Sequence, residues 1–369
     1  MLRRLDSRDL SKLFQALQSK GYEVVGPTEI DGAVCYAPID GPKDLPRGRI
    51  EEQGPGRYRL TESGNGAYFD HVVGPHAWKR YLNPPEQKLF SATGGDAALS
   101  IHALDEVPPK RAFLGVRSCD LAAIEILDKV FENGTFSDAG YVSRRASSLV
   151  IAVNCGRAGD TCFCVSMETG PRAKAGFDIA MTELVDTDSN CFVIEAGTDI
   201  GKEILKQLDL QPVTESETRA AERRISEAAQ NMGREMIADA ADVLKRNLDS
   251  PYWDTIAERC LNCANCTMAC PTCFCSTVED TTDLSGEHAE RWRKWDSCFT
   301  VDFSYIHGGS LRQSGGARYR QWATHKLSHW HDQFGSSGCV GCGRCITWCP
   351  VGIDITEEAR NIKDLERKG

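Results

Sequence analysis

Eight cysteines in the C-terminal third of the sequence stand in two runs of the same spacing. Each run reads Cys-x2-Cys-x2-Cys-x3-Cys-Pro, over residues 260–271 in the first and 339–350 in the second. This is the ligand spacing of paired [4Fe–4S] clusters, in which the fourth cysteine of each run binds the cluster of the other run. The first three cysteines can wrap one cubane in a tight loop, and the fourth reaches across to the neighbouring cubane.

The two runs therefore predict two [4Fe–4S] clusters with four thiolate ligands each. The ligands are Cys260, Cys263, Cys266 and Cys349 for the first cluster, and Cys339, Cys342, Cys345 and Cys270 for the second. The alternatives are two zinc sites or a disulfide framework, but zinc usually takes its ligands from separated Cys-x2-Cys pairs. Because a chance match would have to occur twice with the same spacing, we favour iron–sulfur ligation.

Four further cysteines in the middle of the chain form a second candidate group. They are Cys119, Cys155, Cys162 and Cys164. The first two follow the predicted buried strands 112–116 and 149–153, and the last two form a Cys-x-Cys pair. This arrangement is compatible with a third [4Fe–4S] cluster, and equally with reduced cysteines of a protein core, where this small apolar residue is common.

The remaining cysteines have less specific interpretations. Cys273, Cys275 and Cys298 follow the first run. Three thiols cannot supply the four ligands of a cubane, so we interpret them as groups beside the clusters that tune the reduction potentials. Cys35 and Cys191 are expected in the core.

Histidine and arginine residues near these cysteines give weaker signals. His325 and His329 could share a helix face and bind a metal, but a solvated or interface helix is favoured because no acidic third ligand follows. Three arginines neighbour the proposed ligands and could raise cluster potentials or be ordinary surface residues; they are Arg117, Arg259 and Arg344.

Composition limits the classes of protein to consider. The 369 residues suffice for two or three domains, and a net charge of −10 argues against a nucleic-acid binder. No apolar run is long enough for a membrane span, and no secretory signal is apparent. Seventeen cysteines in such a chain favour a reducing compartment, so we expect a cytoplasmic protein whose cysteines bind metal clusters.

The predicted elements give a mixed fold class, an N-terminal α/β domain followed by a helical ferredoxin-type two-cluster domain. Strands alternate with helices after residue 111, a capping box at Thr214 and Glu217 starts a long helix, and a helical stretch over 318–334 lies between the cysteine runs. The regions expected are an α+β region of unknown role over 1–110, an α/β domain with the third candidate group over 111–213, a linking helix over 214–250 and a helical ferredoxin-like domain over 251–369.

Several signatures of substrate chemistry are missing from the sequence. It contains neither a P-loop nor a G-x-G-x-x-G fingerprint between a strand and a helix, and no catalytic Ser/His/Asp set can be placed. We therefore expect an electron carrier without a substrate site of its own.

Several stretches resemble one known family. They are Arg117–Leu121, Cys162–Met167 with residues 169–171, Cys270–Cys275, Trp295–Cys298, Trp330–Phe334 and Gly338–Pro350. These stretches look like the iron–sulfur β subunit of cytoplasmic, NAD(P)-linked [NiFe] hydrogenases of the sulfhydrogenase type. They are similar also to the A subunit of anaerobic sulfite reductase. The resemblance spans roughly residues 110–360, and the first hundred residues carry no matching motif.

This resemblance implies a heteromeric complex. The chain would pass electrons between a flavin- and NAD(P)-binding diaphorase subunit and the small and large subunits of a [NiFe] hydrogenase. The alternative of the same architecture is the electron-input subunit of anaerobic sulfite reductase. A redox or iron sensor that gains and loses clusters is the alternative from another class, although a DNA-binding surface is not evident at this charge.

Overall fold

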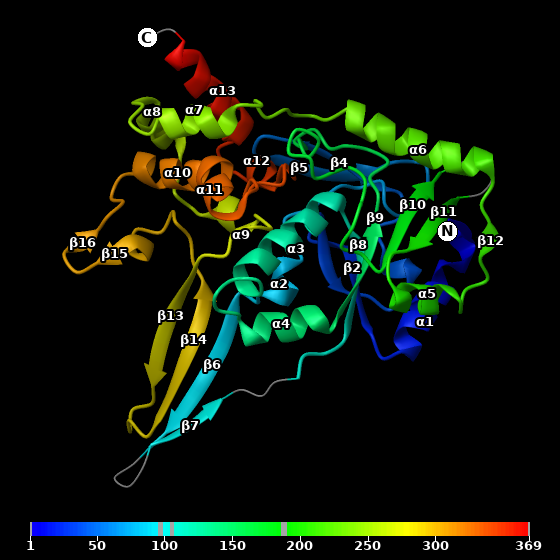
Figure 1. Ribbon diagram of the computed structural model, residues 1–369, viewed down its shortest axis with the longest axis horizontal. Coiled ribbons are helices and arrows are strands. Elements are labelled where there is room, and N and C mark those ends of the chain that lie inside the picture. Colours follow the sequence, from blue (N-terminus) through cyan, green and yellow to red (C-terminus); the bar gives the residue numbers. More distant parts are fainter. Residues whose placement is uncertain (1, 95–98, 104–106, 186–189, 368–369) are drawn as a thin grey trace.

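The computed structural model describes residues 2–94, 99–103, 107–185 and 190–367. Its largest element is an eight-stranded sheet on the N-terminal side (Figure 1). The strand order is β12 (Gln211–Pro212), β1 (Arg3–Asp6), β11 (Cys191–Ala196), β10 (Ile179–Leu184), β9 (Ser148–Val153), β8 (Arg111–Val116), β2 (Glu23–Ile30) and β3 (Ala33–Pro38). The four strands β10, β9, β8 and β2 run parallel, and the outer strands pair antiparallel.

Helices cover both faces of this sheet. The central strands β8 and β9 are apolar almost throughout, as expected for parallel strands buried on both sides. One face packs against α1 (Leu10–Ser19) and α5 (Asp199–Leu205), and the other against α2 (Lys79–Leu82), α3 (Ser118–Phe131) and α4 (Ala139–Ala146). Thr198 caps α5, because its hydroxyl accepts a hydrogen bond from the Gly201 amide.

The sheet includes strands from both sides of residue 110. The strands β1, β2 and β3 belong to the first 38 residues, yet they pair with strands that follow residue 110. The division expected at residue 110 is therefore not a boundary between separate sheets. Pairing between distant segments decides which strands share a sheet, and local sequence pattern does not record it.

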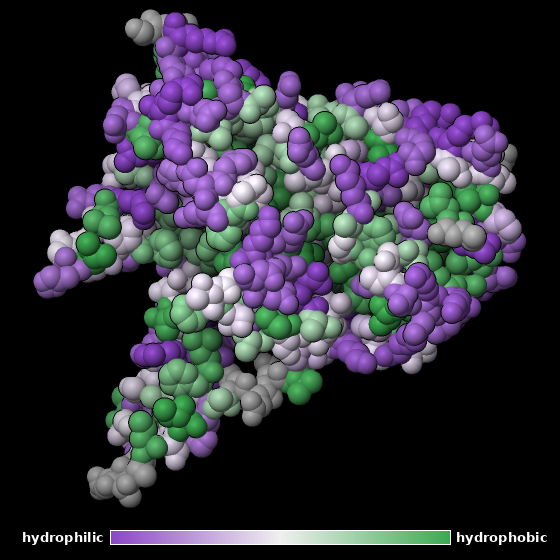
Figure 2. All heavy atoms as spheres, in the orientation of Figure 1, coloured by the Kyte–Doolittle hydropathy of each residue, from purple (hydrophilic) through white to green (hydrophobic). Residues whose placement is uncertain are grey.

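A second sheet forms an arm that extends away from the body (Figure 1). Its order is β13 (Ser276–Thr282), β14 (His288–Trp295), β6 (Glu86–Thr93) and β7 (Ser100–Ala103). The sequence pattern predicts only connections around one or two short elements over residues 73–111, and a helical stretch over 318–334 between the cysteine runs, so it does not predict this arm. Figure 2 shows apolar side chains along this arm, where Ile101, Val278 and Leu284 are exposed.

The prediction of one linking helix over residues 214–250 is wrong, because the chain forms two helices there. The predicted capping box of α6 (Glu215–Gln230) is confirmed, with reciprocal hydrogen bonds between Thr214 and Glu217. The helix ends at Gln230, and α7 covers Ala240–Arg246. Between them the backbone is held by contacts with another loop, since the Arg234 amide donates to the Cys162 carbonyl and the Met236 amide to the Ser166 hydroxyl.

Short helices around one apolar core make up most of the C-terminal part. They are α8 (Tyr252–Arg259), α9 (Asn265–Met268), α10 (Gly315–Thr324), α11 (Trp330–Phe334), α12 (Arg344–Thr347) and α13 (Ile355–Glu366), with a π-helical turn at His325–His329. The hairpins β4 (Arg49–Gly54) with β5 (Arg57–Glu62) and β15 (Tyr305–Ile306) with β16 (Gly309–Ser310) complete the strands, and single 3-10 turns cover Ser7–Asp9, Pro42–Asp44 and Asp302–Ser304. Within the described ranges, none of the helices is both long and apolar enough to cross a membrane.

Candidate iron–sulfur centres

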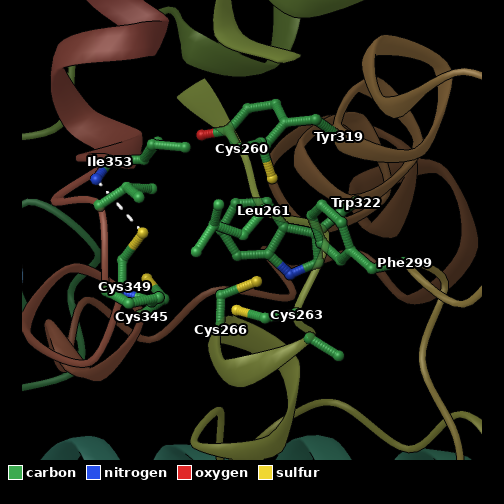
Figure 3. Close-up of a pocket in the computed structure, with 13 residues that line it drawn as sticks. Cys260, Leu261, Cys263, Cys266, Phe299, Tyr319, Trp322, Cys345, Cys349 and Ile353 are labelled. Carbon is green, nitrogen blue, oxygen red and sulfur yellow. Dashed lines mark hydrogen bonds between the residues drawn. The ribbon is translucent and has the colours of Figure 1, made fainter. Parts of the chain in front are cut away.

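The first three cysteines of the first run share a pocket with the fourth cysteine of the second run (Figure 3). The sulfur-bearing residues that line it are Cys260, Cys263, Cys266, Cys345 and Cys349. Four of these five are the residues assigned to one cluster by the crossing pattern. The chain thus folds so that the last cysteine of the second run lies beside the first three cysteines of the first run.

Backbone amides point at two sulfurs of this pocket. The Asn262 amide lies 3.4 Å from Cys260 Sγ, and the Ile353 amide lies 3.3 Å from Cys349 Sγ (Figure 3). The loop that supplies Cys263 has two residues with positive φ, Asn262 and Ala264, which turn the chain tightly around the pocket. N–H groups aimed at sulfur stabilise its negative charge, so both sulfurs suit ligation as thiolates.

Aromatic side chains wall the pocket on its inner side. Phe299, Tyr319 and Trp322 are buried there, whereas Cys263 at the mouth is exposed. Burial raises the pKa of Cys266 well above its ordinary value, and the neighbouring sulfurs of the pocket raise it further. Such thiols give up their protons when a cation binds among them, which is how thiolate ligands are formed on metal binding. The four thiols and apolar walls therefore fit a cluster with one corner near the surface.

The second group of four is buried more deeply. Its members are Cys270, Cys339, Cys342 and Cys345. Burial raises the pKa of Cys345 well above its ordinary value, and the charges of the three other cysteines act in the same direction, so the four sulfurs lie near one another. Cys345 also lines the first pocket, which makes it the link between the two groups.

The third group converges at one edge of the large sheet. Since β8 and β9 are parallel neighbours, the first turn of α3 with Cys119 and the loop with Cys155 lie at the same edge. Burial raises the pKa of Cys164, and the sulfurs of Cys155 and Cys162 raise it further. The four cysteines therefore lie at the same edge of the sheet. The sequence alone did not decide whether they bind a cluster or are core thiols.

The loop with Cys162 and Cys164 lies directly on the second cysteine run. The Phe163 amide donates to the Gly341 carbonyl at 2.8 Å, and Cys162 Sγ lies 4.0 Å from the Cys342 carbonyl oxygen. Gly341 has φ +66°, and a Cβ there would lie 2.6 Å from the Phe163 backbone. Only glycine permits this approach without strain, so the second run is shaped to receive the loop.

Comparison with known proteins supports iron–sulfur binding in the C-terminal part of the chain. Residues 259–353 match a family described as a 4Fe-4S dicluster domain. The chain is 34% identical over 297 residues to sulfhydrogenase 2 subunit beta of Pyrococcus furiosus. The aligned region covers 77% of this chain and 84% of that protein. This chain belongs to the sulfhydrogenase β-subunit family. The resemblance seen in the sequence motifs is thereby confirmed, and the chain is a hydrogenase-type iron–sulfur subunit for electron transfer.

The arginines of this β subunit have roles that the sequence did not reveal. Arg344 is fully buried, and its Nη1 and Nη2 donate to the two carboxylate oxygens of Asp120 at 2.8 and 3.0 Å. Arg117 is also buried and donates to the backbone carbonyls of Phe69 and His71. The surface interpretation is wrong for both residues, whereas Arg259 is half-exposed and pairs with Glu358. Sequence spacing gives no signal for partners 224 positions apart, such as Asp120 and Arg344.

The histidines of the β subunit are not arranged as metal ligands. His325 packs against Phe274 and Trp330, and burial lowers its pKa to about 4. Lys326, Leu327 and Ser328 are buried as well, whereas His331 is exposed, so one face of this stretch packs against the protein and it is not a fully solvated helix. Within the residues that the structure describes, no three His, Cys, Asp or Glu side chains converge as ligands of a single metal ion. Cys35 and Cys191 are buried in strands of the large sheet, as predicted.

Lys326 places a buried positive charge beside the second group. Burial alone would lower its pKa, but negative charge on Cys270, Cys273 and Cys339 raises the pKa well above its ordinary value. Its Nζ donates to the Thr272 hydroxyl at 2.8 Å, and Cys270 Sγ lies 3.2 Å from that hydroxyl. The ammonium group therefore stabilises added negative charge at this group.

Replacing Lys326 with methionine should make the neighbouring cluster harder to reduce. Loss of the positive charge removes on the order of 1–2 kcal/mol of stabilisation of the reduced state at an effective dielectric constant of about 20. An EPR-monitored redox titration would show the lower midpoint potential. Lys245→Met, at an exposed ion pair with Asp332, serves as the control and should leave the midpoint unchanged. An unchanged midpoint in Lys326→Met would contradict the electrostatic role.

Proposed function

We propose that this β subunit relays electrons between a flavin- and NAD(P)H-binding subunit and a [NiFe] hydrogenase core, through three [4Fe–4S] clusters. The observation that carries the proposal is the continuous order of the three cysteine groups. Cys345 joins the first group to the second, and the Cys162 sulfur contacts the Cys342 backbone where the second group meets the third. Electrons pass readily between centres only when these lie close together, and contiguous groups meet that need.

The ligand assignment follows from the groups. We assign the first cluster to Cys260, Cys263, Cys266 and Cys349, the second to Cys270, Cys339, Cys342 and Cys345, and the third to Cys119, Cys155, Cys162 and Cys164. Thiolates in sets of four are the ligands that [4Fe–4S] clusters take. When bound, the clusters supply one-electron redox chemistry. The chain shields the clusters from water and supplies the charged side chains around them.

The two ends of the relay face different parts of the molecule. The first group opens at Cys263, where Leu261 is also exposed. The third group lies at the edge of the large sheet, where Cys164 contacts Met232 in the segment between α6 and α7. A relay with two ends needs two electron partners, which agrees with a place between two other subunits. A chain with seventeen cysteines, twelve of them assigned to clusters, suits a reducing compartment, and we propose the cytoplasm.

The third cluster can be tested by itself. Cys164→Ala should lower the iron content by about four per chain and remove one cluster signal from the EPR spectrum, because a three-thiolate remnant binds a cubane poorly. Cys191→Ala, a buried cysteine of the same sheet, is the matched control and should keep all iron. If Cys164→Ala also keeps all iron, the third group is a set of core thiols.

The relay itself can be tested on the anaerobically purified complex. Hydrogen and NAD(P)H, supplied separately, should each reduce the clusters of the β subunit, and Cys164→Ala should slow hydrogen-driven NAD(P)+ reduction strongly. Dye reduction at the hydrogenase core should stay unchanged in that variant. Reduction by neither donor would contradict the proposal, and co-purification of sirohaem in place of nickel would transfer the same relay to a sulfite reductase.

A further inference from the structure

Two thiols outside the three groups lie together at the base of the arm. Cys275 directly precedes β13 and Cys298 follows β14, and the two strands pair so that Ser276 faces Trp295. The Asp296 amide donates to the Cys275 carbonyl at 2.9 Å, which closes the hairpin at this end. The register therefore brings the two cysteines side by side, although the sequence suggested only separate groups that tune the clusters.

The side chains of Cys275 and Cys298 are in direct contact at the base of the hairpin. The Cys298 thiol forms a direct side-chain hydrogen bond to Cys275 Sγ. In the first pocket, the neighbouring sulfurs raise the pKa values of Cys260 and Cys266 through their charges. Cys270 of the second group makes a thiol–thiol contact with Cys273, which lies outside the three groups. Cluster ligands are held apart by the cubane between them, whereas two thiols in hydrogen-bond contact can form a covalent bond with a small movement.

The surroundings of the pair favour one thiolate. The hydrogen bond from Cys298 lowers the pKa of Cys275 despite its burial, and Lys326 and Lys79 lower it further. The same hydrogen bond raises the pKa of Cys298, which keeps its proton. Lys79 Nζ is buried here, lying 4.0 Å from the Trp295 ring centroid and 2.9 Å from the Cys273 carbonyl oxygen. A thiolate next to a thiol is the reactive form of a redox-active dithiol.

The pair also lies close to two cluster groups. Negative charge on Cys266 of the first group raises the pKa of Cys298. The Lys326 ammonium lowers the pKa of Cys275, and negative charge on Cys270 of the second group raises the pKa of Lys326. The clusters proposed for the first and second cysteine groups would therefore neighbour the dithiol as electron acceptors.

We infer that Cys275 and Cys298 form a redox-active dithiol that exchanges two electrons with the neighbouring clusters by reversible disulfide formation. Attack of the Cys275 thiolate on Cys298 forms the S–S bond, the Cys298 proton leaves to solvent at this partly exposed residue, and two electrons are released. The two electrons would be accepted singly by the two [4Fe–4S] clusters that the first and second cysteine groups would hold, which balances the two-electron oxidation of the dithiol. The site would let a one-electron relay store electrons in pairs. The inference rests on the proposed function, because the clusters are its redox partners.

Thiol trapping across a redox titration tests the pair directly. The anaerobic complex is poised with mediators, denatured in acid with an iron chelator, alkylated and analysed by peptide mass spectrometry. We expect Cys275 and Cys298 to be joined as a disulfide at high potential and both alkylated after dithionite reduction. Cys275→Ser should leave Cys298 alkylated at every potential and reduce the electron uptake by two per chain. Cys191→Ser serves as the control and should keep the full uptake.

Two results would overturn the inference. One is alkylation of both cysteines at every potential in the unmodified complex. The other is loss of about four irons per chain in Cys275→Ser, which would make the residue a cluster ligand. Failure of the proposed function is distinct, because it would appear as missing iron or missing cluster reduction in the unmodified complex.

Discussion

Replacing Cys349 with alanine is expected to remove about four irons per chain, and the cluster lost is the one held mainly by the first run. The reason is that Cys349, although part of the second run, lines the pocket of Cys260, Cys263 and Cys266. Iron analysis of the single variant shows the loss but not which cluster is gone. Pairs of substitutions identify it.

Two double variants separate crossed from uncrossed ligation. Cys349→Ala combined with Cys263→Ala should lose no more than about four irons, because both residues bind the same cluster. Cys349→Ala combined with Cys339→Ala should lose about eight, because the two residues bind different clusters. The reverse order of losses would show that each run keeps its own fourth cysteine.

Asp120→Asn is expected to destabilise the fold by about 3–5 kcal/mol, because it leaves the Arg344 charge buried without a counter-charge. The side chains of Arg344 and Asp120 are 0% and 1% exposed, so solvent cannot replace the missing partner. Arg344 lies between Cys342 and Cys345, the proposed ligands of the second cluster, and Asp120 follows Cys119 of the third group. The ion pair therefore connects the segment of the second cysteine group to the segment of the third.

Thermal or denaturant unfolding of the cluster-loaded protein measures this effect. Asp280→Asn is the matched control, since Asp280 pairs with Arg291 at exposed positions of the arm and should change stability by less than about 1 kcal/mol. The double variant Asp120→Asn with Arg344→Met should recover part of the loss, because the unpaired charge is gone. Equal stability of Asp120→Asn and Asp280→Asn would contradict a structural role for the buried pair.

The two cysteine runs were recognisable in the sequence because their ligands have fixed spacing. The buried strands β8 and β9 and the capped helices were also predictable, since apolar runs and capping residues act over a few positions. The arm was not, because β6 pairs with β14 about 200 residues later in the chain. The break after α6 was missed for a similar reason: contacts with the Cys162 loop override the helical pattern.

The third cysteine group shows the same limit of sequence reasoning. The sequence showed that Cys119 and Cys155 each follow a strand. It did not show that the two residues lie close together, because this depends on β8 and β9 being neighbours in the sheet. The Cys275–Cys298 pair was missed because hairpin register alone brings the two residues together. Arg344 was judged without Asp120, whose distance in sequence conceals the pair.

Iron and acid-labile sulfide analysis of the anaerobically purified chain, with EPR of the dithionite-reduced sample, tests the three-cluster relay most directly. The account predicts about twelve irons and twelve sulfides per chain, with EPR signals from interacting [4Fe–4S] clusters. About eight irons would contradict it, because the relay would then end at the second group without reaching the edge of the large sheet. Zinc in place of iron would contradict it entirely.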